Sequence, residues 1–109
     1  MRNLMREKLL NGKKVLGTFF QSGSEAVMEA IAVSGLDFVI IDKEHGPIGV
    51  ETALGLIRAA ELRNITPLVR IKDISRSSVL KVLDIGAQGI IVPAVPGIDD
   101  AKKLVEYGK

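Results

Sequence analysis

The chain has 109 residues, of which 47% are hydrophobic, and a formal net charge of +2. This length permits one modest core and predicts a single domain over residues 1–109. The chain contains no cysteine, which excludes a disulfide framework. Aromatic residues make up only 4% and no basic stripe is present, so nucleic-acid binding is not expected. No apolar stretch approaches the ~18 residues of a membrane span, and the N-terminus lacks a secretory core, so we expect a cytoplasmic protein with no membrane partner.

Short apolar runs alternate with segments of helical periodicity along the rest of the chain. A short helix is predicted over residues 3–11, ending at Asn11-Gly12. The predicted strands that follow begin at Val15, Phe38, Pro67 and Gly89. The predicted apolar helix faces are Val27, Ala30 and Ile31; Leu54, Ile57 and Ala60; Val79, Val82 and Leu83; and Ala101, Leu104 and Val105. Helix starts are predicted at Ser24, Ser75 and Asp99 or Asp100, and C-terminal caps at Gly35 and Gly86.

This βαβαβαβα alternation indicates an α/β fold. Strands that are apolar on both faces and alternate with helices form a parallel sheet covered by helices. Two architectures satisfy the pattern. One is an open doubly wound domain, for which this length suffices. The other is a (β/α)₈ barrel, which typically needs about 250 residues and of which four βα units are half.

The strongest chemical signal is the stretch IIDKEHGP, in which an apolar run ends in polar side chains. They are Asp42, Lys43, Glu44 and His45, the only histidine of the chain. Arg70 lies near the carboxyl end of the next predicted strand. In both architectures the carboxyl ends of the strands form the ligand-binding face. The residues therefore predict an anion-facing arginine beside a loop that offers a base.

Structural roles remain open for the same residues. His45 can be a solvated loop histidine, Asp42 a helix cap, and Arg70 an ion-pair partner of Asp42. Asp84, near the end of the third long helix, is typical of a surface residue. One histidine without cysteine cannot supply three nitrogen or sulfur ligands to zinc. A hard cation such as Mg²⁺ needs only one or two carboxylates, which Asp42 and Glu44 could provide.

Three stretches together resemble one family of enzymes. GLDFVIIDKEHGP, PLVRI and VLKVLDIGAQGIIVPAV, in this order and at this spacing, are similar to the HpcH/HpaI aldolases. These are class II, metal-dependent pyruvate aldolases acting on 4-hydroxy-2-oxo acids and 2-dehydro-3-deoxy sugar acids. The resemblance runs from about Leu16 to Pro96. It implies a (β/α)₈ TIM barrel, of which this chain would hold the first four βα units, the N-terminal half.

The resemblance also implies roles for individual residues. His45 would be the general base, and Arg70 would bind the substrate's ketone oxygen and stabilise the enolate. Asp42 would orient His45. Asp84 matches an aspartate that raises the basicity of the histidine. Because the end of that helix should lie at the opposite face of the barrel, we expect Asp84 to reach the histidine of a neighbouring subunit.

Three further expectations follow from the resemblance. The family's divalent metal (Mg²⁺, Mn²⁺ or Co²⁺) is held by a Glu and an Asp that would lie beyond Lys109, so no metal ligand is assigned in this chain. A homo-oligomer is expected, with trimer-based hexamers suggested. Lys43 occupies a position that is often small or apolar in the family.

Two other classes of function stay open. One is a related metal-dependent lyase that acts on acyl-CoA esters. The other is a half-barrel that serves as a non-catalytic interaction or assembly module, because a half-barrel exposes two sheet edges that another chain could cover.

Overall fold

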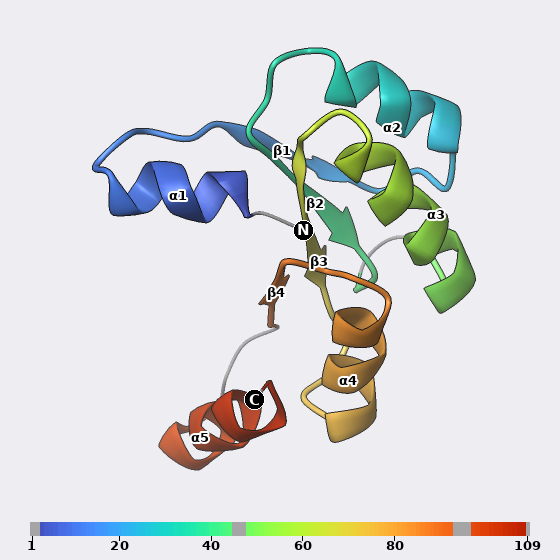
Figure 1. Ribbon diagram of the computed structural model, residues 1–109. Helices are drawn as coiled ribbons and strands as arrows, with labels where there is room; N and C mark the ends of the chain where they lie inside the picture. Colours follow the sequence, from blue (N-terminus) through green and yellow to red (C-terminus); the bar gives the residue numbers. More distant parts are fainter. Residues whose placement is uncertain (1–2, 45–47, 93–96, 109) are drawn as a thin grey trace.

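The computed structural model, shown in Figure 1, describes residues 3–44, 48–92 and 97–108 of the chain. Helices and strands alternate along these residues. They are α1 (Leu4–Leu10), β1 (Gly17–Phe20), α2 (Glu25–Ala32), β2 (Phe38–Asp42), α3 (Val50–Glu61), β3 (Thr66–Arg70), α4 (Arg76–Asp84), β4 (Gly89–Ile91) and α5 (Ile98–Tyr107). Each predicted element is present, with boundaries shifted by a few residues. No helix of the described residues is long and apolar enough to cross a membrane.

The sheet decides between the two predicted architectures. Its four strands are parallel and lie in the order β1-β2-β3-β4, so each strand pairs with its neighbour in sequence. A doubly wound sheet reverses its strand order at a switch point, whereas a barrel adds its strands consecutively. Right-handed crossovers that always step in one direction place their helices on one face. Figure 1 shows α2, α3 and α4 on that face. The fold is therefore four βα units of a (β/α)₈ barrel, a half-barrel.

The core lies between the sheet and these helices. Val39, Ile41 and Val69 point toward the helices and are completely buried. On the opposite face of the sheet, Phe19 is 52% exposed although its strand neighbour in register, Ile40, is buried. The two faces thus differ as expected for a barrel wall, in which one face meets the helices and the other faces the barrel interior.

The two serines cap their helices as predicted, whereas the C-caps are Val33 and Ile85 rather than Gly35 and Gly86. The hydroxyls of Ser24 and Ser75 accept the first-turn N–H groups of α2 and α4. Gly35 and Gly86 follow these helices with φ of 91° and 105°, a left-handed conformation that favours glycine. Both glycines reverse the chain into the next strand.

The start of α5 differs from the prediction. The helix begins at Ile98 with Gly97 as its N-cap, so neither Asp99 nor Asp100 is the cap. Both aspartates lie in the first turn instead. A carboxylate is favourable there because the amino end of a helix carries a partial positive charge. The two aspartates therefore predicted the start of α5 to within a few residues, but the N-cap residue was predicted wrongly.

The predicted apolar face of α2 is also wrong. Its buried residues are Met28 and Ala32, whereas Val27 is 45% exposed and Ala30 is exposed. Ile31 is partly buried and packs against the core. Because α2 is apolar around most of its circumference, periodicity alone could not select the buried face.

The predicted apolar faces of α3 and α4 agree with the structure, whereas that of α5 agrees only in part. Ile57 and Ala60 of α3, and Val79 and Val82 of α4, are buried as predicted. Of the three residues predicted for α5, Leu104 packs against the core, while Ala101 and Val105 are exposed; Tyr107, which was not predicted, packs there as well.

Helix α1 lies at the amino-terminal edge of the sheet. The backbone N–H of Met5 donates to Thr66 Oγ1 at the start of β3 (3.3 Å). Lys8 forms an ion pair with Asp37, which directly precedes β2. The carboxyl-terminal edge is left to the loops that follow the strands.

Candidate active site

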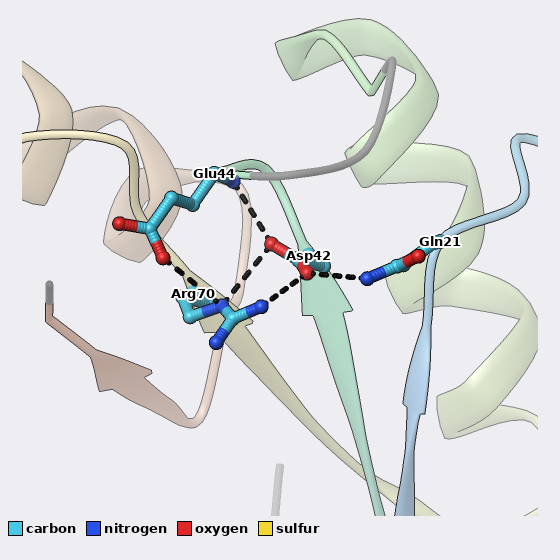
Figure 2. Close-up of polar contacts among 4 residues, drawn as sticks. All are labelled: Gln21, Asp42, Glu44 and Arg70. Atoms are coloured by element: carbon cyan, nitrogen blue, oxygen red, sulfur yellow. Dashed lines mark hydrogen bonds and ion pairs between the residues drawn. The ribbon is translucent and has the colours of Figure 1, made fainter.

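Polar side chains gather at the carboxyl ends of β1, β2 and β3. Asp42 is the last residue of β2 and Arg70 the last residue of β3, and the two are partners in the parallel register. Gln21 directly follows β1. Figure 2 shows the side chains of all three converging, together with Glu44 from the loop after β2. The sheet itself therefore brings the site together.

The centre of the site is an ion pair between Asp42 and Arg70. Nε of Arg70 donates to Oδ1 of Asp42 at 3.2 Å, and Nη2 donates to Oδ2 at 2.5 Å. This is the bidentate geometry in which a guanidinium binds a carboxylate most strongly. The Asp42 side chain is 0% exposed and that of Arg70 is 20% exposed. The predicted structural alternative for Arg70, pairing with Asp42, is confirmed.

Two more donors compensate the buried carboxylate. Nε2 of Gln21 donates to Oδ2 of Asp42 at 3.0 Å, and the backbone N–H of Glu44 donates to Oδ1 at 3.0 Å. Each carboxylate oxygen therefore accepts from two donors within the described residues. A fully buried charge is tolerated only when it is paired and hydrogen-bonded in this way.

Arg70 is held from two further sides. The Glu44 carboxylate lies 3.4 Å from its Nε, and the ring of Phe19 lies 4.8 Å from Cζ, within the range of a cation–π contact. The hydrogen bonds with Asp42 raise the pKa of Arg70 further, although partial desolvation opposes this. The guanidinium therefore stays charged at every pH at which the fold persists.

One part of the guanidinium remains available for a ligand. Within the described residues Nη1 of Arg70 has no hydrogen-bond partner, and Figure 2 shows it directed away from Asp42. An arginine that is fixed on one side and open on the other is suited to bind an oxyanion at the ligand-binding edge of the sheet.

The other predicted site residues lie elsewhere. His45 falls within residues 45–47, outside the residues that the structure describes, so its role as base and its orientation by Asp42 stay predictions. Asp84 is exposed and is the last residue of α4, from which the chain enters the amino end of β4. It therefore lies at the edge opposite Asp42 and Arg70, and its contact with the histidine of a neighbouring subunit stays a prediction.

Sequence reasoning missed two contributors to the site. Gln21 and Phe19 were not singled out, because a glutamine or phenylalanine carries no chemical signal of its own. The available signal was positional: both residues lie at the carboxyl end of β1, and both project to the face of the sheet that carries Asp42 and Arg70. Glu44 was considered only as a loop acid and as a carboxylate for Mg²⁺, not as a partner of Arg70.

The described residues do not form a metal site. No group of three His, Cys, Asp or Glu side chains suited to a metal occurs within residues 3–44, 48–92 and 97–108. Asp42 and Glu44, the carboxylates considered for Mg²⁺, both contact the guanidinium of Arg70 instead. The single positive charge of Arg70 is therefore shared between two carboxylates.

Known proteins are similar to the chain in sequence and in fold. The model of the HpcH/HpaI aldolase/citrate lyase family matches residues 16–109. The chain is 31% identical over 105 residues to the 2-keto-3-deoxy-L-rhamnonate aldolase of Escherichia coli O17:K52:H18. These matched residues make up 96% of the chain and 39% of that protein. The crystal structure of citrate synthase SbnG is 44% identical with a TM-score of 0.89, covering 93% of the chain and 41% of SbnG.

A second solved structure agrees. The HpcH/HpaI aldolase from Desulfitobacterium hafniense DCB-2 is 31% identical with a TM-score of 0.90, over 96% of this chain and 41% of that one. The chain therefore spans about two fifths of the length of these relatives. Because the family model covers most of the chain, and because solved members share its fold, the chain belongs to the HpcH/HpaI aldolase/citrate lyase family.

Proposed function

We propose that the protein carrying this chain is an aldolase, a carbon–carbon lyase that cleaves 4-hydroxy-2-oxo acids or 2-dehydro-3-deoxy sugar acids to pyruvate and an aldehyde. The observation that carries this proposal is the buried Asp42–Arg70 pair at the carboxyl edge of the sheet. The aldolase relatives in the same family support it.

The reaction needs a fixed positive charge. When the bond between C3 and C4 of the substrate breaks, its electron pair remains on the pyruvate half as an enolate. Asp42 holds the Arg70 guanidinium in place, and Nη1 is the donor that would bind the enolate oxygen. A donor positioned in advance stabilises developing charge without reorganisation, and such a contact is typically worth about 10²–10³ in rate.

The reaction also needs a base. The proton of the 4-hydroxyl must leave as the C3–C4 bond breaks, and C3 of the enolate must then gain a proton. We assign both transfers to His45, because an imidazole is the side chain best suited to accept and return a proton at neutral pH. Asp42 would orient the ring from within the chain. Asp84 would act on the histidine of a neighbouring subunit in a homo-oligomer, for which a trimer-based hexamer is proposed.

A divalent cation is part of the proposal but not of the site described above. The family resemblance implies Mg²⁺, Mn²⁺ or Co²⁺, and the proposed ligands are a Glu and an Asp outside this chain. Chelation should abolish activity, and adding back one of these cations should restore it. Activity that survives exhaustive chelation would contradict the metal-dependent proposal.

Citrate formation is a second candidate. Its support is the 44% identity to citrate synthase SbnG. Condensation of an acetyl group with an oxo acid forms a carbon–carbon bond, and Arg70 would then hold the oxygen of the oxo acid rather than of a departing enolate. The arrangement of Asp42 and Arg70 is compatible with both reactions, carbon–carbon bond cleavage that releases pyruvate and carbon–carbon bond formation that gives citrate.

One experiment separates the two candidates. Pyruvate release from a 4-hydroxy-2-oxo acid is followed with a lactate-dehydrogenase-coupled assay, and citrate formation from oxaloacetate and acetyl-CoA is assayed in parallel. The aldolase proposal predicts pyruvate release that Arg70→Ala abolishes. Citrate formation without pyruvate release would favour the second candidate, and neither product would remove both.

A further inference from the structure

A cavity of about 570 Å³ lies beside the candidate active site. The segments that follow β2 and β3 line it, together with the amino-terminal parts of α3 and α4. Its charged lining residues are Lys43, Lys72, Asp73 and Lys81. Three ammonium groups therefore face one carboxylate, which gives the cavity an excess of positive charge.

Lys43 connects this cavity to the candidate active site. It directly follows Asp42, and its backbone N–H donates to the carbonyl oxygen of Arg70 at 2.9 Å. Its side chain is half-buried, and within the described residues no acid forms an ion pair with it. Burial lowers the pKa of Lys43, and the charges of Lys72 and Lys81 lower it further, whereas Asp73 opposes the shift.

The carboxylate in the cavity already has other partners. Asp73 accepts a hydrogen bond from the hydroxyl of Ser78 at 2.6 Å. Hydrogen bonds from Ser78 and then Ser75 hold the pKa of Asp73 below its usual value. The same two serines form the cap of α4. Asp73 is therefore part of the helix start, and its single charge leaves the three lysines undercompensated.

Like charges that converge on one cavity destabilise a fold unless an anion joins them. Gly49 and Val50, at the start of α3, line the same cavity, and Gly49 has no side chain to cap the helix. Backbone N–H groups at a helix start add to an anion site that lysines have already formed. Among the described residues that line the cavity the cations are all lysines. Arginine would favour planar carboxylate recognition, whereas lysines surround a phosphate as point charges.

We propose that this cavity binds a phosphate group through Lys43, Lys72 and Lys81, either as free phosphate or as the monoester of a small molecule. The site is distinct from the Asp42–Arg70 pair, so its test does not depend on the proposed aldolase activity.

Phosphate binding is tested by titration calorimetry on the native protein that carries this chain. Inorganic phosphate is titrated at an ionic strength held constant with sodium chloride. Lys43→Met should weaken binding by about tenfold or more, because it removes the least exposed of the three charges. Lys81→Met should weaken it as well. Lys103→Met, on α5 and away from the cavity, is the matched control and should bind like the wild type.

Thermal unfolding gives an independent readout. Phosphate in large excess over its dissociation constant should raise the Tm of the wild type by about 3 °C relative to chloride, and should leave that of Lys43→Met unchanged. Without phosphate, Lys43→Met should be at least as stable as the wild type, because it relieves repulsion. Equal shifts in both salts, or unchanged binding in both cavity variants, would overturn the proposal.

A third titration separates the two sources of the phosphate group. Glycerol 3-phosphate that binds with the same affinity as inorganic phosphate would indicate a site for the free anion. Tighter binding of the ester would indicate a site for a phosphorylated small molecule. Both results support the proposed phosphate chemistry, whereas binding of neither ligand contradicts it.

Discussion

Strand β2 has an aspartate at each end, and the two aspartates form different ion pairs. Asp37 directly precedes the strand and pairs with Lys8 of α1 at the amino-terminal edge of the sheet. Asp42 ends the strand and pairs with Arg70 of the neighbouring strand at the carboxyl-terminal edge. The same residue type, five positions apart in the chain, thus meets a flexible lysine at one edge and a fixed arginine at the other.

Exposure separates the two pairs. The side chains of Lys8 and Asp37 are 47% and 16% exposed, whereas those of Arg70 and Asp42 are 20% and 0% exposed. An exposed pair contributes little to stability because water competes for both charges. Removing one partner of a buried pair is strongly destabilising, because the other charge is then left uncompensated in the interior. The amino-terminal pair therefore attaches a helix, while the carboxyl-terminal pair fixes a cation where a ligand can reach it.

The largest expected effect comes from removing the arginine. Arg70→Ala should lower kcat/KM for pyruvate release by about 10³-fold, because it removes the donor for the enolate and leaves Asp42 unpaired. It should also lower the Tm, since the buried carboxylate loses two of its donors. Arg70→Lys keeps the charge but not the bidentate geometry, so it should recover only part of the activity. Full activity in Arg70→Lys would argue for a role through charge alone.

The next effect concerns the carboxylate that positions the arginine. Asp42→Asn keeps the shape of the side chain but removes its charge and one acceptor oxygen, so Arg70 should lose its fixed orientation. We expect kcat to fall about 10–100-fold and the free energy of unfolding to fall by about 2–3 kcal/mol. Asp37→Asn at the other end of the strand is the matched control and should leave kcat unchanged. An equal loss of kcat in both variants would remove the distinction between the two edges.

Gln21 tests how far the support of the carboxyl-terminal pair extends. Gln21 follows β1, and its side-chain amide donates to Asp42 Oδ2 at 3.0 Å. Gln21→Leu removes this donor and should reduce kcat about two- to fivefold, because one hydrogen bond is lost while the bidentate pair itself remains. Gln21→Glu should be worse than Gln21→Leu, since it places a second carboxylate beside Asp42. Steady-state kinetics of the two variants, with Tm values as a check on folding, measures the difference.

The fold followed from the sequence more completely than the site did. Apolar runs at regular spacing predicted the strands, and Gly86 with its left-handed backbone marked a helix end. These signals are local, so each can be recognised without knowing its neighbours. The choice between barrel and doubly wound sheet was not local. It depended on the strand order, and the pairing of β2 with β3 together with that of β3 with β4 decides it.

The site shows the same division. Asp42 and Arg70 were predicted because charged residues at the ends of apolar strands are unusual. For Arg70 the sequence left two alternatives open, an ion pair with Asp42 or a bound anion. The choice depends on the register between β2 and β3, which brings together two residues that are 28 positions apart in the chain. The support from Phe19 and Gln21 was missed for the same reason. Neither residue is unusual in type, and only the alignment of β1 beside β2 gives it a partner.

The smallest expected effect lies at the amino-terminal edge and depends on pH. The hydrogen bond from Lys8, followed by that from the backbone N–H of Leu16, lowers the pKa of Asp37 from its usual 3.8. Because the folded-state pKa lies below the unfolded value, the stabilisation is present above about pH 4 and is lost as the pH falls through the folded pKa. Since water reaches the half-exposed Lys8 of this pair, we expect Asp37→Asn to lower the Tm by only about 2 °C at pH 7.

That difference should shrink in 1 M salt, where charges a few ångströms apart are already screened, and should vanish toward pH 2.5. Thermal unfolding of the wild type and Asp37→Asn from pH 7 to pH 2.5, at low and high salt, measures it. Asp42 should behave in the opposite way, because its burial shields the pair from salt. We therefore expect Asp42→Asn to lower the Tm equally at both ionic strengths. A salt dependence shared by the two variants would mean that the two ends of β2 are electrostatically equivalent.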